Sequence, residues 1–364
     1  MNIILLSNYS IGCVPFYVKR ALEKLGHNVY SFSPDYDSNG WTRCSKDVDV
    51  NEIVKNISVP IDLVLCVEAS TGTKFFPKGL DRVPVPTAWW GIDNHLNYRW
   101  HKEYANVFDI AFFAQKEYLL KAQKYGTKNS FWLPLGCDED IHRDRNLERI
   151  YDVSFVGNLT PNRKAFFNTL DVPVNLVSGV YLDEMSKVYS QSKIVLNISA
   201  REDLNMRAFE VMCAGALLVT QRIDAGIHDL FAEGRHFVFH DIKNAGDILR
   251  YYLDHPKERE RIAGAGKEIV IRENSYTKRV ETILAKVKEF SGYAETRKQK
   301  YDSYKIYIQE SLVYRHRSFK LQNEARQLFH EAISRNAVLT LFYVLRFSLF
   351  RLIERIDKIF KKNF

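Results

Sequence analysis

The sequence lacks several patterns that would assign it to a familiar class of site. Its five cysteines are scattered, with no Cys-x-x-Cys pair and no Cys/His metal spacing, which argues against a zinc site and a disulfide framework. No Gly-x-Gly-x-x-Gly follows the first apolar run, so a dinucleotide fingerprint is absent. The first ten residues lack a basic region and a small-residue cleavage site, and they predict a strand and not a signal peptide. We therefore expect a cytoplasmic protein in a reducing compartment.

The composition is that of a folded protein with two domains and an extension. Of 364 residues, 46% are hydrophobic and 26% are charged, a balance that excludes an intrinsically disordered chain. The length accommodates two domains of ordinary size plus a further segment. All of the net charge of +8 lies in residues 291–364, which hold 15 Lys and Arg against 7 Asp and Glu. The basicity therefore belongs to the tail and not to the body.

Residues 1–140 alternate between apolar runs and helical spacing. The runs at 2–7, 61–67, 85–90 and 107–114 predict strands of a buried parallel sheet. The spacing at 15–25 and 116–125 predicts helices that each end at a glycine. The strand–loop–helix opening followed by Gly-His-x-Val is common to Rossmann-like half-domains. We expect one Rossmann-like domain over 1–140 and a polar linker over 138–149.

The most informative stretch is residues 199–215, SAREDLNMRAFEVMCAG. It lies between apolar runs at 194–198 and 216–220 that predict buried parallel strands, so the order is strand, polar loop, helix and strand. In an open parallel sheet, anionic ligands bind at such a loop and at the helix start that follows it. Arg207 at this helix start is unfavourable for the helix dipole. A bound phosphate group would explain its presence.

Glu202 and Glu210 in this stretch have the Glu-x7-Glu spacing of retaining GT-B glycosyltransferases. The spacing alone is weak, because it recurs at 260–268 and 273–281 in a different setting. The longer string LNISAREDLNMRAFEVMCAGA closely resembles the nucleotide-sugar site of CgeB-like (spore-maturation-type) glycosyltransferases. That resemblance implies an α/β GT-B fold, in which two Rossmann-like domains face a cleft. It also implies that Asn205 and Arg207 bind the donor, that Glu210 holds the donor ribose and that Glu202 orients the sugar. The alternative is an ordinary solvated helix start.

The second domain, expected over 150–275, opens with a strand at 151–156 and a Gly-Asn turn. Backbone amides at Gly157 and Asn158, with Arg163 and Lys164 nearby, can cradle a pyrophosphate. GT-B enzymes carry Arg or Lys in a similar turn, which makes these four residues donor-binding candidates by resemblance. The alternative is that Arg163 or Lys164 is an ordinary solvated side chain at a helix start. Ser178 follows the next short strand, which by position resembles the segment that lines the base pocket.

The candidate acceptor side is the junction after the strand at 85–90. Trp90, Ile92 and Asp93 match a Trp-x-Ile-Asp motif of CgeB-like enzymes. A carboxylate at Asp93 beside His95 could orient an acceptor hydroxyl or act as a base. The alternative is that Asp93 and Asn94 form an Asx turn or N-cap for a helix that begins near residue 96.

Residues 276–364 comprise a closing helix and a basic extension that the resemblance does not cover. Basic side chains alternate with aromatic and aliphatic ones over 337–362, which is typical of an interfacial helix on an anionic membrane surface. The apolar run within it is shorter than the roughly 20 residues that span a bilayer. The alternative is an amphipathic helix packed on the body or on a partner subunit. No nucleic-acid module is present, so we expect no nucleic-acid partner.

Together these features predict glycosyl transfer from a nucleotide-sugar donor to a saccharide or lipid-linked acceptor, in surface polysaccharide or glycoconjugate synthesis. We expect no metal and no other cofactor, because Arg side chains and helix amides can stabilise a leaving diphosphate. The resemblance favours retention of configuration, whereas a base at Asp93 would suit inversion. Two other classes would share the donor site: a nucleotide-sugar epimerase of GT-B fold and a non-catalytic sugar-nucleotide-binding assembly protein.

Overall fold

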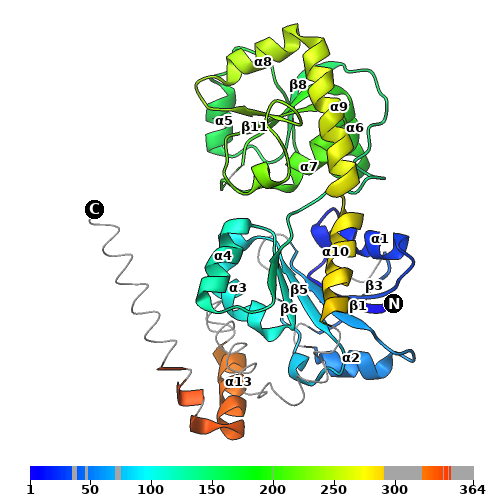
Figure 1. Ribbon diagram of the computed structural model, residues 1–364, viewed down its shortest axis with the longest axis vertical. Coiled ribbons are helices and arrows are strands. Elements are labelled where there is room, and N and C mark those ends of the chain that lie inside the picture. The colour runs from blue at the N-terminus through cyan, green and yellow to red at the C-terminus, as the bar shows by residue number, and fades with distance from the viewer. Residues whose placement is uncertain are drawn as a thin grey trace.

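The computed structural model describes residues 1–34, 39–45, 48–69, 75–199, 201–290, 322–338, 340–342 and 344–345. They form two α/β domains, one above the other in Figure 1, and each domain is built on a parallel sheet. The expected two-domain α/β architecture is therefore confirmed.

The first domain contains a seven-stranded parallel sheet in the order β3-β2-β1-β4-β5-β6-β7. Its strands are β1 (Asn2–Leu6), β2 (Asn28–Ser33), β3 (Trp41–Arg43), β4 (Leu63–Val67), β5 (Thr87–Gly91), β6 (Ile110–Phe113) and β7 (Ser130–Trp132). Its helices are α1 (Val14–Lys24), α2 (Val50–Asn56), α3 (Asn94–Tyr104) and α4 (Lys116–Tyr125), with 3-10 turns at Leu80–Arg82 and Ala105–Val107. The strand order reverses between β1 and β4. Ligands of open parallel sheets bind beyond the carboxyl ends of the strands at such a reversal.

The second domain contains a five-stranded parallel sheet in the order β12-β11-β10-β8-β9. Its strands are β8 (Tyr151–Val156), β9 (Asn175–Val177), β10 (Ser192–Asn197), β11 (Leu217–Gln221) and β12 (Val238–His240). Its helices are α5 (Pro161–Phe167), α6 (Leu182–Ser190), α7 (Met206–Cys213), α8 (Ala245–Asp254) and α9 (Pro256–Glu273), with a 3-10 turn at Ile227–Asp229. Here the strand order reverses between β8 and β10.

The chain crosses between the domains twice, first between β7 and β8 and again between α9 and α10 (Tyr276–Glu289). Backbone hydrogen bonds join the first passage to the second. The Cys137 amide donates to the Asn274 carbonyl at 3.3 Å, and the Tyr276 amide donates to the Cys137 carbonyl at 2.7 Å. A Cβ atom on Gly136 would lie 2.7 Å from the Asn274 oxygen, so this approach requires glycine. After the second passage, α10 packs against α1 of the first domain (Figure 1). The closing helix thus belongs spatially to the first domain.

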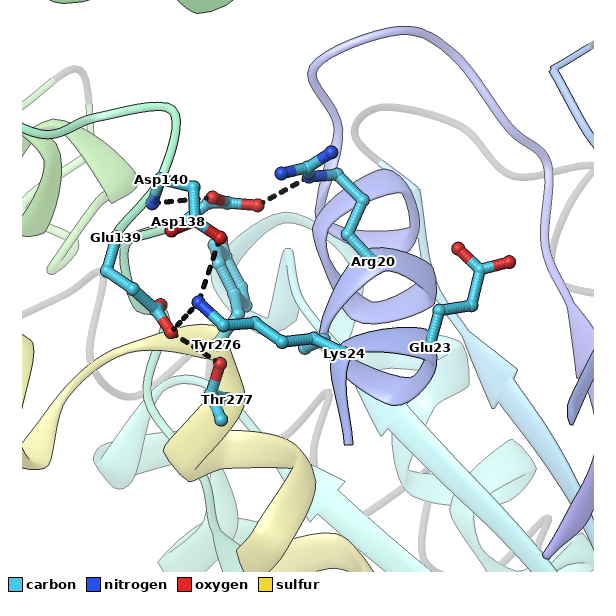
Figure 2. A pocket seen from close by; sticks show the side chains of 9 residues that line it. Arg20, Glu23, Lys24, Asp138, Glu139, Asp140, Tyr276 and Thr277 are labelled. Atoms are coloured by element: carbon cyan, nitrogen blue, oxygen red, sulfur yellow. Dashed lines mark hydrogen bonds and ion pairs between the residues drawn. The ribbon is translucent and has the colours of Figure 1, made fainter. Parts of the chain in front are cut away.

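Charged side chains surround the first passage. Arg20 on α1 donates to Asp138 at 2.8 Å, and Lys24 one turn later contacts Glu139 at 3.0 Å and Asp140 at 2.8 Å (Figure 2). They line a hollow of about 320 Å³. One apolar cluster runs through both domains beneath these ion pairs. The passages therefore form a shared core, and the linker expected over 138–149 is not simply a solvated polar run.

The strands and helices predicted in the body are confirmed with shifts of a few residues at their ends. Among the elements without a clear sequence pattern are β3, β7 and β12, with three residues each, and α2, with seven. In the extension, the sequence has a helical period over 301–330; Gln322–Arg335 forms α13, whereas 301–321 and most of 337–362 lie outside the described residues. Among the described helices, none is both long and apolar enough to cross a membrane.

Candidate functional site

Two arginine side chains converge at the reversal between β8 and β10. Arg207 on α7 donates to the Val156 carbonyl at 2.8 Å and to the Asn197 side-chain oxygen at 2.8 Å. Arg163 on α5 donates to the carbonyls of Asn158 and Ile198 at 2.9 and 2.6 Å. Each guanidinium therefore bridges the ends of the same two strands, and the structure brings together these two predicted donor residues.

Both guanidinium groups lie over one aromatic ring. Their Cζ atoms are 4.6 Å (Arg207) and 5.2 Å (Arg163) from the centre of the Phe155 ring. Burial and the neighbouring charge of Arg207 lower the pKa of Arg163. The Arg163 Nε atom is buried and has no hydrogen-bond partner in the described part of the chain. Among the described residues, neither guanidinium has a carboxylate within 4.0 Å. These two adjacent cations, whose carboxylate neighbours Asp203 and Glu210 act only from beyond ion-pair distance, favour a bound anion.

The turn after β8 allows the arginine pair to come this close. Gly157 has φ of +150°, and a Cβ atom there would lie 2.4 Å from the Arg207 guanidinium. Asn158 is exposed and contributes its carbonyl to Arg163. Lys164 is exposed on the next position of α5, and Ser178 is exposed after β9. These last two residues lie at the rim, outside the set of bonds that holds the arginine pair.

The loop between β10 and α7 is organised around the Ser199 hydroxyl. This oxygen accepts hydrogen bonds from the Arg201 and Asp203 amides at 3.1 and 2.9 Å and donates to the Asp203 carboxylate. Glu202 at the top of the loop is exposed and has φ of +57°, an unusual conformation for a non-glycine residue. Such strain is concentrated at functional loops.

Asn197 at the end of β10 is a site residue that the sequence analysis did not single out. Its side chain is fully buried. Its oxygen accepts from Arg207 and, at 3.2 Å, from Asn205, and its amide nitrogen donates to Thr220 at 3.1 Å. The sequence did contain a signal for this residue, because Asn197 is a polar side chain near the end of an otherwise apolar strand. Asn197 therefore orients two of the predicted donor residues.

Glu210 lies on the second turn of α7, and its side chain is buried. Burial raises the pKa of its carboxyl to about 7, and the positive charge of Arg207 offsets only part of that rise. Its nearest cationic or imidazole contact is His142 Nε2 at 3.8 Å from Oε1. A carboxylate so weakly compensated is costly to bury, and functional sites concentrate such groups.

On the first domain, Glu68 organises the turn that carries Asp93 and His95. It follows β4 at the reversal of the first sheet and is buried. It accepts hydrogen bonds from the Ile92 and Asp93 amides at 2.7 and 3.0 Å and contacts His101 Nε2 at 3.0 Å. Burial favours the neutral acid, but His101 and the amide donors outweigh it and hold the pKa of Glu68 below its usual range.

Asp93 occupies the N-cap position of α3, yet its side chain makes no capping hydrogen bond. Asn94 is instead a fully buried structural residue, whose amide nitrogen contacts His101 Nδ1 at 2.9 Å. His95 is half-buried, and its Nδ1 atom is enclosed without a partner among the described residues. The capping alternative is therefore only half correct. A helix does begin at this junction, but the Asp93 side chain does not cap it.

Gln115 joins this turn to the donor-side loop. The backbone N–H of Gln115 donates to the Asn94 side-chain oxygen at 3.1 Å. Its side chain donates to the Leu204 carbonyl and accepts from the Leu204 amide, both at 3.4 Å. Nearby, Lys116 pairs with Asp229 across the domains. The candidate acceptor turn and the 199–205 loop therefore meet across the domain boundary.

A hollow of about 600 Å³ adjoins Arg163, within the size range of small-molecule sites. Its lining includes Phe166, Ser199, Arg201, His240 and Ile242. Among the residues described, no group of three or more His, Cys, Asp and Glu side chains could hold a metal ion. The basic and apolar lining suits an anionic ligand with a partly apolar body.

Comparison with known proteins gives one family match and many similar folds. Residues 142–285 match a family model described as glycosyl transferase-like. No curated protein matches the sequence. A glycosyltransferase from Rickettsia africae has a TM-score of 0.58 at 12% identity, over 79% of this chain and 98% of its own. Anabaena Alr3699/HepE in complex with UDP has a TM-score of 0.58 at 11% identity, over 79% and 100%. Sucrose-phosphate synthase from Thermosynechococcus elongatus has a TM-score of 0.59 at 10% identity, over 80% and 100%.

The matched residues contain α5, α7, the arginine pair and Glu210. At these identities the solved structures establish the fold, which is the GT-B fold. Together, the family match over the second domain and the fold of the two α/β domains support a GT-B glycosyltransferase.

Proposed function

We propose that this protein transfers a sugar from a nucleotide-sugar donor to a saccharide or lipid-linked acceptor. The observation that carries the proposal is the arginine pair, two guanidinium groups that form no ion pair with a described carboxylate, at the strand reversal of the domain with the family match. A similar structure, Anabaena Alr3699/HepE, is in complex with UDP. The CgeB-like subtype and a role in surface polysaccharide or glycoconjugate synthesis are part of the same proposal.

The donor diphosphate lies against Arg207 and Arg163 in this proposal. As the bond to the sugar breaks, negative charge accumulates on the leaving diphosphate, and pre-positioned cations stabilise it without reorganisation. The backbone at Gly157 and Asn158 and the exposed Lys164 complete the phosphate contacts. The two guanidinium groups supply the charge that a metal would otherwise provide, so we propose a metal-independent reaction.

Glu210 accepts hydrogen bonds from the donor ribose, with Ser178 on the side of the base. Glu202 and Asn205 contact the sugar from the loop held by Ser199. Across the domain boundary, Asp93 and His95 face the acceptor hydroxyl. Gln115 supports this arrangement, because it bonds to Leu204 in the donor-side loop and to Asn94 beside Asp93 and His95. Retention follows the family resemblance, and an inverting reaction would instead use Asp93 as the base.

The extension is the proposed attachment to an anionic membrane surface or a partner subunit through 337–362. In its described part, Val338, Leu341, Phe342 and Leu345 are between 54% and 78% exposed. Large apolar side chains with this exposure favour an interface. Sedimentation with vesicles containing anionic lipid tests membrane attachment; sedimentation equal to that of a chain ending at residue 336 would contradict it.

The test of the donor site is a thermal-shift and turnover screen against UDP-, GDP-, ADP-, CMP- and dTDP-sugars. One nucleotide class should stabilise the protein, and Arg207→Ala should abolish that stabilisation. Arg272→Ala is the matched control, because Arg272 is an exposed arginine of α9 that pairs with Glu268. Absence of stabilisation by every nucleotide would refute the proposal.

Turnover separates the proposed transferase from the two other classes. A transferase hydrolyses its sugar nucleotide slowly without acceptor and quickly with it. A GT-B-fold epimerase would yield an altered nucleotide sugar without any acceptor. A non-catalytic binder would be stabilised and show neither product.

A further inference from the structure

Four side chains from four segments meet in a buried cluster where the domains join. Tyr17 comes from α1, His142 from the first passage, Glu210 from α7 and Tyr276 from the start of α10. At most 5% of each residue is exposed. The sequence analysis placed His142 in a polar linker, but its imidazole is fully buried and its ring centre lies 5.0 Å from that of Tyr17.

The hydrogen bonds of His142 determine which nitrogen carries the proton. The Asp138 amide donates to Nδ1 at 2.9 Å, so Nδ1 is an acceptor. Burial, reinforced by the charge of Arg20, lowers the pKa of His142 to about 3, so the ring is neutral near pH 7. A neutral imidazole whose Nδ1 accepts carries its proton on Nε2. Asp138 is itself held by Arg20, as Figure 2 shows.

The Nε2–H group faces two oxygens. The Tyr17 hydroxyl lies 3.2 Å away and Glu210 Oε1 lies 3.8 Å away. The second distance exceeds that of a hydrogen bond, and contacts of this kind shorten when a ligand orders a site. Burial and the charge of Glu210 raise the pKa of Tyr17, which keeps its hydroxyl protonated. Tyr276 lies on the same side, with its hydroxyl enclosed and without a partner among the described residues.

We propose that His142 is a positioning residue that holds the Glu210 carboxylate, charged and oriented, for the ribose hydroxyls of the donor. The ribose part of this inference rests on the proposed function. The Asp138 amide and Tyr17 of α1 hold His142 in place. Through His142, the orientation of the Glu210 carboxylate in the second domain therefore depends on the position of the first domain. Besides His142, the groups that face Glu210 are Arg207 on its own helix and Tyr17, Tyr189 and Tyr276 on the neighbouring helices.

Two substitutions separate the roles of the two ring nitrogens. His142→Asn retains an acceptor for the Asp138 amide and removes the donor that faces Glu210. His142→Gln retains a donor near the position of Nε2 and removes the acceptor. A purely structural histidine would be affected most by the loss of the acceptor, whereas a positioning histidine is affected most by the loss of the donor.

The first readout needs no nucleotide. In each background, the pH dependence of the stability difference caused by Glu210→Gln reports the titration of Glu210. The difference should change from about pH 4.5 upward and level off at the folded-state pKa of Glu210, which we call its titration midpoint and expect near 7 with His142 present, because burial raises that pKa to about 7. His142→Asn should raise this midpoint by about one pH unit, since the charged form loses its donor. His142→Gln should leave the midpoint in place while lowering stability at every pH. A midpoint unchanged by His142→Asn would overturn the inference.

A measurement on the unmodified ring guards against a variant that fails to fold. In protein with ¹⁵N-labelled histidine, the ring shifts of His142 should show a neutral Nε2–H tautomer. Its Nε2 shift should follow the titration of Glu210 and become independent of pH in Glu210→Gln. A pH-independent shift in the wild type, or the opposite tautomer, would overturn the inference.

The second readout uses UDP, GDP, ADP, CMP and dTDP as probes. For the nucleotide that binds, we expect His142→Asn to weaken affinity about tenfold at pH 7 and His142→Gln about twofold. Equal weakening by both variants would contradict a role through Nε2. If the wild type binds none of the five, the proposed function fails, while the ligand-free midpoint and the ring shifts still decide the contact between His142 and Glu210.

Discussion

The two halves of the molecule each bury one carboxylate near the strand reversal, and the two carboxylates differ in their surroundings. Glu68 in the first domain accepts hydrogen bonds from two amides and from Asn97 and contacts His101, and its pKa is held low. Glu210 in the second domain lies 3.8 Å from His142, and its pKa is raised to about 7.

On the proposed function, this difference distinguishes a framework group from a group placed for a ligand. The bonds of Glu68 are all internal, and they fix the turn at Asp93 and the start of α3. Glu210 is buried with little internal compensation, so a ligand that supplies hydroxyl donors would stabilise its charged form. The arginine pair has the complementary property, because neither cation forms an ion pair with a described carboxylate. The second domain therefore carries the electrostatic imbalance, whereas the first domain compensates its buried carboxylate internally.

The largest expected effect is on Glu68. Glu68→Ala removes the acceptor of two buried amides and of His101, and we expect a loss of about 3–5 kcal/mol in the free energy of unfolding. Urea denaturation monitored by circular dichroism measures it. Glu117→Ala is the control, because it removes a carboxylate that pairs with Lys121 on the surface of α4. A loss below about 1 kcal/mol would remove the contrast between the two carboxylates.

Glu210→Gln should have the opposite sign. The folded pKa of Glu210 is above its usual value, so the associated stability is present at acid pH and is lost as pH rises through about 7. At pH 8 the wild type bears the cost of a buried charge, and Glu210→Gln should be more stable by about 3 kcal/mol. At pH 5 the difference should be small. Denaturation at the two pH values measures it, and a variant that is less stable at pH 8 would contradict the weak compensation of Glu210.

The same titration should appear in nucleotide affinity. In the proposed function the charged carboxylate accepts the ribose hydroxyls, so affinity should be constant above pH 7 and weaken by about tenfold per pH unit below it. Glu210→Gln should bind more weakly and lose this dependence. Calorimetric titration between about pH 5.5 and 8.5 tests it. Titration of His142 does not produce this loss of affinity below pH 7, because the pKa of His142 is about 3. If affinity still weakens below pH 7 in Glu210→Gln, another group is responsible for the pH dependence.

The smallest expected effect concerns the ion pairs over the passage between the domains. Lys24 is 45% exposed and contacts Glu139 and Asp140. Lys24→Ala should cost less than about 1 kcal/mol, because solvent screens such pairs. A substantially larger loss would mean that these pairs, and not the apolar cluster beneath them, hold the domains together.

Much of the fold was predictable because long apolar runs and glycine stops carry a strong periodic signal. The strands β1, β4, β5 and β10 and the helices α1 and α4 were all expected. Three-residue strands such as β7 and β12 contain too few side chains to show alternation. The burial of His142 was missed because its polar neighbours in the sequence, Arg143 and Asp144, suggest a solvated linker.

The sequence by itself determined the order of strands and helices, and it placed Arg207 and Glu210 on the helix after a buried strand. Local spacing is sufficient for that, because each feature lies within about 20 consecutive residues. Tertiary structure decided that Arg163, and not Lys164, shares the Phe155 ring with Arg207. It also decided the opposite pKa shifts of Glu68 and Glu210. These properties depend on burial and on partners from distant segments, such as His101 for one carboxylate and His142 for the other, which are brought together only when the chain folds.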